Sequence, residues 1–516
     1  MRLHKEDFMK KLISLLLVLA MLFCIVGCTS DTDTNKKDDS TKAPANSTPA
    51  PTDGTALTVG EHAISGAILS YFYMDSVTEF CSQFSSYGDL ADLYLQLYAG
   101  LSLTTALNQQ YYDKEAGKTW ADYFVESAVE NATWTYAMYD AALAAQYTLP
   151  EDVQKELDAF PTTLQTYATY MGYQDVNTYL QSIYGENAHV DSYIEYYRMA
   201  WVAAEYAEQH YNDLTFTLDE IDAYEVGKEV NYNSYSFATY YISVSKYMQH
   251  LFGKQDTYTD EQKNQAQREA NALAEELASK ATSVSALDLA ILQANLDSKL
   301  FATSCVEAKY TLYSSIGNEE VRNWLTEDDR YWCDAGVVSN KVDDTVDGYY
   351  VVLLNSVDDN KTPLANVPHI LVLAKTDEEF DAAWEKAEQI LAEFQSSEAQ
   401  DSATFGELAK QYSEDGGSKN NGGLYENICR NHYYVESFEN WAVAGHEPGD
   451  TGIVETEYGV HIMYYKEHGA MTYRQYMIES ELRIDEQLRW EDEIVDAVTA
   501  TLHDTSCLAM DLVING

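Results

Sequence analysis

Three side chains capable of acid–base and hydrogen-bonding chemistry stand near glycine-rich segments in the last third of the chain. His369 opens a short apolar run, His461 lies in the middle of a second one, and Asp415 lies between them in a Ser-Glu-Asp-Gly-Gly segment. Neutral imidazole has a donor and an acceptor on opposite sides of its ring. Two histidines on neighbouring strands can therefore hydrogen-bond across the floor of a slot, and a carboxylate on a loop can set the field at its edge. One histidine alone is more often a satisfied core residue, so the prediction depends on the combination.

Hydrophobic spacing predicts the elements that position these side chains. Thr376 stands three residues before Glu379, which is typical of a helix start, and apolar residues then repeat at helical spacing to Phe394. A second helix is expected over 405–412 and a short one over 438–444. With the two apolar strands at its ends, this segment is expected to be a small α+β domain.

The order of these motifs resembles the parvulin family of peptidyl-prolyl isomerases. His-Ile-Leu, Ser-x-Asp, Gly-Gly-Leu and Gly-x-His-Ile follow one another between about Val367 and Glu467. The resemblance implies that His369 and His461 are paired core histidines. It also implies that Asp415 takes the position held by Cys or Asp in the family, so these three residues are the predicted catalytic set.

The same resemblance implies a pocket for a proline ring, lined by Leu424, Tyr434 and Phe438. Tyr434 stands where the family usually has Met or Leu, and Tyr425 and Glu426 depart from the usual residues after that leucine. The implied reaction needs no metal and no cofactor. Rotation about an X-Pro bond is slow because it breaks amide resonance, against a barrier of about 18–20 kcal/mol, so a slot that favours the twisted amide over the planar one accelerates it.

A fainter copy of this plan is predicted upstream, over about 235–357. Tyr241 and Tyr350 are assigned to the positions of His369 and His461, and an Asn-Trp pair and a Gly-Val-Val segment recur in order. No counterpart of the Ser-x-Asp or Gly-Gly-Leu loops is evident in this segment. We therefore expect a degenerate parvulin-like module that serves spacing or client contact.

The region before this copy is predicted to be mainly helical. A short hairpin is expected over 57–64, and helices are expected to begin at Pro150 and at Thr217, which forms a capping box with Glu220. This order resembles the N-terminal chaperone region of PrsA- and SurA-type foldases, which implies that a final helix, expected from about Thr472 to His503, returns to this region. The abundant tyrosines are expected to pack helix faces, with an aromatic cradle for unfolded chains as the alternative. These tyrosines are Tyr167, Tyr170, Tyr173, Tyr179, Tyr184, Tyr193, Tyr196 and Tyr197.

The N-terminus has the pattern of an export signal. Two lysines precede an apolar run over 12–26, which is shorter than the roughly 20 residues of a membrane-spanning helix. The run ends in Val-Gly-Cys, which resembles the bacterial lipobox and implies lipidation of Cys28. Residues 29–55 contain no large apolar side chain that could form a core, so they are expected to form a flexible tether. Met9 begins a Met-Lys-Lys pattern, so either Met1 or Met9 is the start.

The overall charge excludes one large class of partners. Asp and Glu number 84 against 32 Lys and Arg, a net charge of −52, which repels nucleic acid and anionic lipid headgroups. The acidity serves solubility or attracts basic, unfolded clients. The seven cysteines show no Cys-x-x-Cys pair and no zinc spacing, so free thiols are expected.

These observations predict an α+β protein that helps exported proteins fold, anchored by lipid on the extracytoplasmic side of the cell membrane. The expected partners are unfolded or partly folded exported proteins. A holding chaperone with both parvulin-like modules inactive is the first alternative, and a solute-binding lipoprotein is the second. The expected divisions are a signal peptide (1–27), a tether (28–55), a helical domain (56–234), a degenerate module (235–360), an isomerase module (361–468) and a C-terminal helix (469–516).

Overall fold

The computed structural model describes residues 54–327, 330–343, 345–431 and 433–514. The predicted signal segment and Cys28 lie outside the described residues. The chain divides into two compact units, residues 1–215 with 483–516 and residues 216–482. No helix among the described residues is long and apolar enough to cross a membrane.

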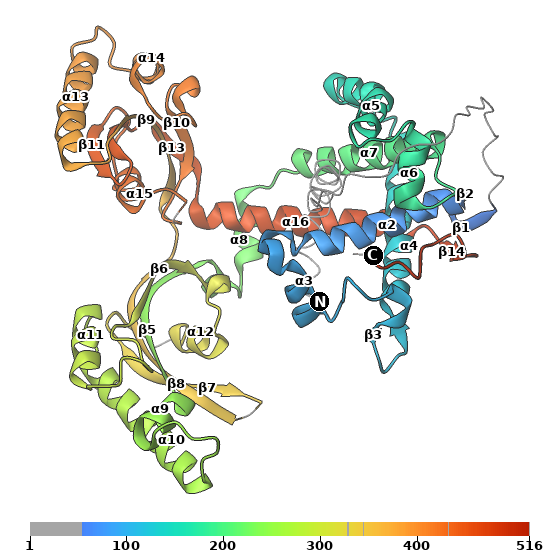
Figure 1. Ribbon diagram of the computed structural model, residues 1–516. Coiled ribbons are helices and arrows are strands. Elements are labelled where there is room, and N and C mark those ends of the chain that lie inside the picture. The colour runs from blue at the N-terminus through green and yellow to red at the C-terminus, as the bar shows by residue number, and fades with distance from the viewer. Residues whose placement is uncertain (1–53, 328–329, 344, 432, 515–516) are drawn as a thin grey trace, which may run out of the picture. The chain divides into compact units, whose positions relative to one another are not determined.

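The first unit is mainly helical, as predicted (Figure 1). Its strands β1, β2 and β14 form a sheet in the order β14-β1-β2, and the predicted hairpin is the β1–β2 pair. Helices α2, α4 and α7 pack together around the core. The elements are β1 (Thr55–Val59), β2 (His62–Ser65), α2 (Gly66–Ser82), α3 (Ala91–Tyr94), β3 (Tyr111–Asp113), β4 (Lys118–Thr119), α4 (Trp120–Ala144), α5 (Glu151–Tyr170), α6 (Val176–Tyr184), α7 (Val190–Asp213) and β14 (Ala500–Leu502).

Most of the tyrosines of this unit pack helix faces, as expected. Tyr179, Tyr184, Tyr193 and Tyr196 are buried in its core. The hydroxyls of Tyr184 and Tyr196 both donate to the carboxylate of Asp75, at 3.2 and 2.6 Å. Buried tyrosines of this kind stabilise the domain and leave no aromatic cradle at these four positions.

The end of the chain returns to the helical domain. Helix α16 (Tyr473–Asp496) carries Glu491, whose carboxylate accepts a hydrogen bond from the Trp134 indole at 2.9 Å. The predicted helix to His503 is wrong in its last turns, because α16 ends at Asp496 and residues 500–502 form β14. Strand β14 pairs with β1, with Leu57 opposite Leu502. This strand depends on a partner more than 440 residues away, so local spacing did not indicate it.

The second unit contains two α+β modules whose sheets share one strand order. The upstream sheet runs β6-β5-β8-β7 and the downstream sheet runs β10-β9-β12-β11, with β13 also on β9. The upstream elements, after α8 (Leu218–Glu225), are β5 (Ser234–Ser243), α9 (Val244–Phe252), α10 (Asp260–Lys280), α11 (Val284–Gln293), β6 (Val306–Leu312), α12 (Glu319–Leu325), β7 (Ala335–Val342) and β8 (Thr345–Asp358). The downstream elements are β9 (Pro363–Leu373), α13 (Asp377–Gln395), α14 (Ser402–Tyr412), β10 (Leu424–Ile428), α15 (Glu436–Ala442), β11 (Thr451–Thr456), β12 (Gly459–Tyr464) and β13 (Glu467–Thr472).

The strand registers correct one assignment in the upstream module. In the downstream sheet His461 lies opposite Leu371, and His369 lies opposite Met463. In the upstream sheet Tyr350 lies opposite Tyr241, as His461 lies opposite Leu371.

The counterpart of His369 is therefore Thr239, which lies opposite Val352, and Tyr241 takes the position of Leu371. The prediction that Tyr241 replaces His369 is wrong by two residues. The glycines support this alignment, because Gly336 lies opposite Val352 as Gly452 lies opposite Met463.

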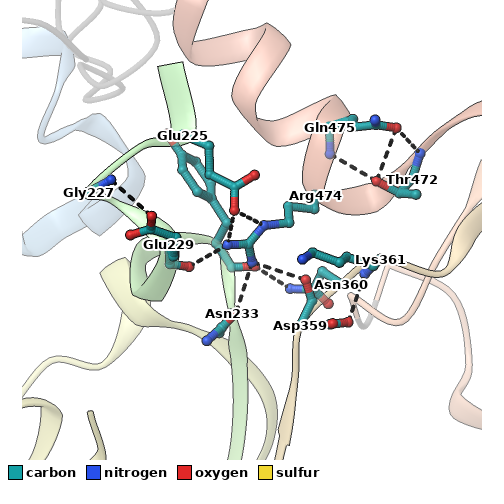
Figure 2. Close-up of polar contacts among 11 residues, drawn as sticks. Glu225, Gly227, Glu229, Asn233, Asp359, Asn360, Lys361, Thr472, Arg474 and Gln475 are labelled. Atoms are coloured by element: carbon teal, nitrogen blue, oxygen red, sulfur yellow. Dashed lines mark hydrogen bonds and ion pairs between the residues drawn. The ribbon is translucent and has the colours of Figure 1, made fainter. Parts of the chain in front are cut away.

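One buried arginine joins the segments that enter and leave the modules (Figure 2). Arg474, 3% exposed, is at the start of α16. Its guanidinium donates to the carboxylate of Glu225 at 2.7 Å, to the side-chain oxygen of Asn233 at 2.8 Å and to the carbonyls of Glu229 and Asp359 at 2.7 and 3.1 Å. A planar guanidinium with five N–H donors suits such a junction.

Candidate active site

The site forms where β9 and β12 lie side by side in the downstream sheet. His369 on β9 and His461 on β12 lie on the same face, and their ring centroids are 5.3 Å apart. Both rings are buried, His369 at 1% and His461 at 7% exposure. The structure thus brings the two predicted histidines together in one pocket floor.

Strand β9 is held beside a tight glycine turn that fixes the His369 ring. The Nδ1 atom of His369 donates to the carbonyl of Gly423 at 3.1 Å, and its backbone N–H donates to the same carbonyl at 2.8 Å. Gly423 has a φ of +75°, and a Cβ at this position would lie 2.1 Å from the His369 carbonyl oxygen. Only glycine allows this approach, which is the physical reason for the Gly-Gly-Leu motif here.

The carboxylate of Asp415 is surrounded by donors. His369 Nε2 lies 3.3 Å from Oδ2, the Tyr425 hydroxyl donates to the same oxygen at 2.9 Å, and the Ser418 hydroxyl also donates to it. The backbone N–H groups of Gly417 and Ser418 donate at 3.1 and 3.2 Å. The contact with His369, together with the Ser418, Gly417 and Tyr425 hydrogen bonds, holds the pKa of Asp415 well below its usual range. Asp415 is therefore a fixed negative charge at the pocket wall.

His461 is a neutral partner in this arrangement. Burial, with a contribution from nearby His369, lowers the pKa of His461 to about 3. Its Nε2 atom lies 2.9 Å from the Thr456 hydroxyl, while its buried Nδ1 has no hydrogen-bond partner among the described residues. The expected hydrogen bond between the two histidines is absent from the part of the chain that the structure describes, because each ring bonds to a different neighbour.

Aromatic rings form the apolar part of the pocket. The Phe438 ring meets the His369 ring edge-on, at 5.2 Å and 86°, and lies 5.5 Å from the Tyr434 ring. Tyr425 stacks on His369 at 4.9 Å and 27°. The resulting cavity has a volume of about 430 Å³ and is lined by His369, Leu371, Asp415, Tyr425, Tyr433, Tyr434, Val435, Phe438, Thr456, Glu457, Tyr458 and His461.

Five of the six predicted site residues of this module line that cavity. Leu424 is the exception: it is on β10 opposite Pro368, and its neighbour Tyr425 contributes the side chain to the pocket. The departure at Tyr425 thus has a role, because its hydroxyl donates a hydrogen bond to Asp415. Sequence reasoning also missed Leu371, which follows His369 at the two-residue interval that puts both on one face of a strand.

The upstream module keeps the scaffold of this site without its polar groups. A Cβ added to Gly336 would lie 2.7 Å from the Trp324 indole, as one added to Gly452 would lie 2.4 Å from that of Trp441. Helices α12 and α15 therefore correspond, and Val321 stands three residues before its tryptophan, where Phe438 stands in α15.

The floor of the upstream module is also different. The Tyr241 hydroxyl donates to Asp347, and its ring lies 4.5 Å from that of Tyr350. Two phenol rings thus occupy the positions that Leu371 and His461 hold in the downstream pocket.

Comparisons with known proteins agree with the downstream site. Residues 369–467 match the family model described as rotamase, PPIC-type PPIase domain. No curated protein matches the chain.

Several solved structures are similar to parts of the chain. A peptidylprolyl isomerase (PrsA) from Bacillus cereus is 27% identical, over 27% of this chain and 50% of that one, with a TM-score of 0.19. A SurA-like chaperone from Campylobacter jejuni is 25% identical over 27% and 53%, with a TM-score of 0.17. PrsA from Bacillus subtilis is 16% identical over 56% and 78%, with a TM-score of 0.18. The chain spans about half the length of the first two of these proteins.

Proposed function

We propose that this chain, whose residues 369–467 are a PPIC-type peptidyl-prolyl isomerase domain, is an extracytoplasmic folding factor that isomerises X-Pro bonds in client proteins. One observation carries the proposal. An apolar wall of Phe438 and Tyr434 faces an ionised Asp415 and two buried histidines within a single cavity of about 430 Å³. That combination suits a reaction in which an apolar ring is gripped and an adjacent amide is twisted.

The charge of Asp415 favours the twisted amide. In the planar amide, resonance places negative charge on the carbonyl oxygen, and rotation about the C–N bond removes it. A carboxylate near that oxygen therefore destabilises the planar form relative to the transition state, which is differential binding of the kind that raises a rate. No bond is made or broken, and no proton needs to be transferred.

The apolar residues supply the grip. A proline ring against Phe438 and Tyr434 is held while the remainder of the peptide rotates, and burial of the ring provides the binding free energy. His461 is neutral because burial lowers its pKa to about 3, so this ring adds no positive charge that would stabilise the planar amide.

An exposed apolar row in the helical unit favours a second role, the holding of unfolded clients. Tyr87, Leu90, Leu93, Leu97 and Tyr98 are all exposed, within a segment of 12 residues that contains α3. Exposed apolar side chains that gather on a surface mark interaction sites, whereas apolar side chains exposed singly are normal. This row is a second candidate for client contact, beside the aromatic cradle that was the alternative interpretation of the other tyrosines.

The lipid anchor and the cellular location are part of the same proposal. They are supported by the apolar run over 12–26, the Val-Gly-Cys ending and the polar stretch after Cys28. Two acyl chains or more give stable membrane attachment, whereas one gives marginal attachment. The solute-binding alternative has no support from the two modules, whose sheets have all their strand pairs antiparallel.

Exchange NMR on a short proline peptide tests the isomerase proposal directly. The full chain should speed cis–trans exchange, and Phe438→Ala should lower the enzymatic rate by at least tenfold because the wall of the slot is lost. Val321→Ala removes the corresponding side chain of the upstream module and should leave the rate unchanged.

Two results would redirect the proposal. An equal loss of rate in Val321→Ala would place the activity in the wrong module. No acceleration by the wild-type chain, with suppression of client aggregation retained, would favour the holding chaperone.

A further inference from the structure

The pocket has an unbalanced charge at its rim. Asp415 and Glu457 both line the cavity, and no lysine or arginine of the described residues lines it. The two carboxylates have different surroundings. Asp415 accepts hydrogen bonds from Tyr425, Ser418 and Gly417, which fix its position at the pocket wall.

Glu457 is not held by hydrogen bonds in this way. It is exposed, in the short turn between β11 and β12, and its carboxylate has no hydrogen bond or ion pair among the described residues. Thr456 and Tyr458 on either side of it also line the cavity, so the turn presents Glu457 to whatever occupies the slot.

Two exposed aromatic rings accompany this charge. Tyr433 is 79% exposed and Tyr458 is 56% exposed, and both line the cavity. The Tyr458 backbone is fixed, because its N–H donates to the Thr456 hydroxyl at 3.2 Å and its carbonyl accepts from Ala374 at 3.1 Å. The face of a phenol ring attracts cations, guanidinium and ammonium groups above all.

We propose that the slot selects prolines preceded by lysine or arginine, an inference that rests on the proposed isomerase function. The side chain of the preceding residue branches one bond from the carbonyl that must lie near Asp415. It therefore falls within the same cavity, where Glu457 and the rings of Tyr433 and Tyr458 provide a carboxylate and two π faces. The residue after proline branches further from that carbonyl.

The charge of the whole module acts in the same direction. Residues 361–468 contain 20 Asp and Glu against 7 Lys and Arg. A negative surface raises the local concentration of basic peptides and their association rates, an effect that falls with ionic strength. The rim charge at Glu457 adds a local preference to this general attraction.

Exchange NMR on Ala-X-Pro-Ala peptides tests the inference with the full chain, since no auxiliary protease then adds its own specificity. Norleucine matches the length of lysine and lacks the ammonium group. We expect the lysine peptide to exchange roughly five-fold faster per enzyme than the norleucine peptide at 20 mM salt, the size of one exposed ion pair and one exposed cation–π contact. The glutamate peptide should exchange more slowly than the norleucine peptide.

Matched variants assign the preference to the rim. Glu457→Gln should lower the lysine-to-norleucine rate ratio to about half its wild-type value or less. Glu455→Gln, two residues earlier on β11 and outside the cavity lining, should keep the wild-type ratio. Both variants keep the side-chain size and are exposed, so folding is preserved.

The outcomes separate this inference from the function on which it rests. Equal acceleration of the lysine and norleucine peptides overturns the selectivity and leaves the isomerase intact. A preference that appears only when lysine follows the proline also overturns it. An equal loss of ratio in Glu455→Gln shows a general charge effect and refutes the role of Glu457, whereas no acceleration of any peptide refutes the isomerase function itself.

Discussion

Replacement of Asp415 by asparagine separates the charge of the carboxylate from its shape. The Oδ2 atom of Asp415 accepts from the Tyr425 hydroxyl and from Ser418 and lies 3.3 Å from His369 Nε2, and Oδ1 accepts from the N–H of Gly417. In Asp415→Asn one of these oxygens becomes an amide N–H₂, which then faces a donor. Hydrogen bonds to a charged group contribute about 1.5–3 kcal/mol each, against about 0.5–1.5 kcal/mol for neutral ones. We therefore expect a loss of about 2–4 kcal/mol in the free energy of unfolding of the module at pH 7.

The loss should depend on pH in a defined direction. The folded-state pKa of Asp415 is lowered, so its stabilising contribution is present above the unfolded pKa of about 4 and is lost as the pH falls through the lower folded pKa. The difference between wild type and Asp415→Asn should therefore shrink at pH 3.

Urea unfolding, monitored by hydrogen exchange of the segment 413–425, measures this difference within the module. Exchange NMR should also show an isomerisation rate reduced by about tenfold, which corresponds to about 1.4 kcal/mol in the barrier. A variant as stable as wild type at pH 7, or a stability difference that stays constant from pH 7 to pH 3, refutes the reasoning.

Three further predictions concern other parts of the chain. Cys28→Ala should release the protein from the membrane fraction or block its signal processing, and unchanged attachment contradicts the lipid anchor. Burial raises the pKa of Asp75 to about 6, so its ionisation makes the helical unit less stable as the pH rises from about 4 through 6. In urea unfolding at pH 7.5, Asp75→Asn should then have a free energy of unfolding about 1–3 kcal/mol higher than that of wild type. At pH 4 the two proteins should unfold at a similar urea concentration. Arg474→Lys should speed limited proteolysis within 226–233 and 359–362 at least tenfold while the isomerase rate stays the same, and equal proteolysis shows that the junction in Figure 2 does not hold these segments.

The elements around the site could be predicted because their signals are local. Thr376 accepts a hydrogen bond from the N–H of Glu379, as the spacing indicated, and the apolar stripe that follows is the buried face of α13. The capping box of Thr217 and Glu220 was predicted for the same reason. Side-chain caps and helical stripes involve residues three or four positions apart, so the sequence contains the whole interaction.

The register of the upstream module could not be predicted in this way. Thr239 and Tyr241 are two residues apart, so both side chains lie on the same face of β5. A slip of two residues keeps the alternation of apolar and polar side chains intact, whereas a slip of one reverses it. Only the pairing of Thr239 with Val352 and of Tyr241 with Tyr350 identifies which residue stands at the His369 position.

The hydrogen bonds of the site were also beyond the sequence, because each depends on a backbone group or side chain from another element. His369 bonds to the Gly423 carbonyl and His461 bonds to Thr456, although the types of the two rings suggested a bond between them. Tyr425 was identified as a departure, yet its hydroxyl is a donor to Asp415. A residue that departs from a motif can thus supply the group that another part of the site requires.

The two modules show how little of a shared scaffold defines this chemistry. Their sheets have the same strand order, and a tryptophan packs on a glycine at the same place in each. The differences include three side chains on that scaffold: Thr239, Val321 and Tyr350 stand where the downstream module has His369, Phe438 and His461. Valine is too small to form the apolar wall, and the Tyr350 ring lies 4.5 Å from Tyr241 on the floor where a proline ring would be held. We therefore propose that activity follows the side chains of the slot, and that the upstream module keeps the fold without the side chains that bind and twist an X-Pro bond.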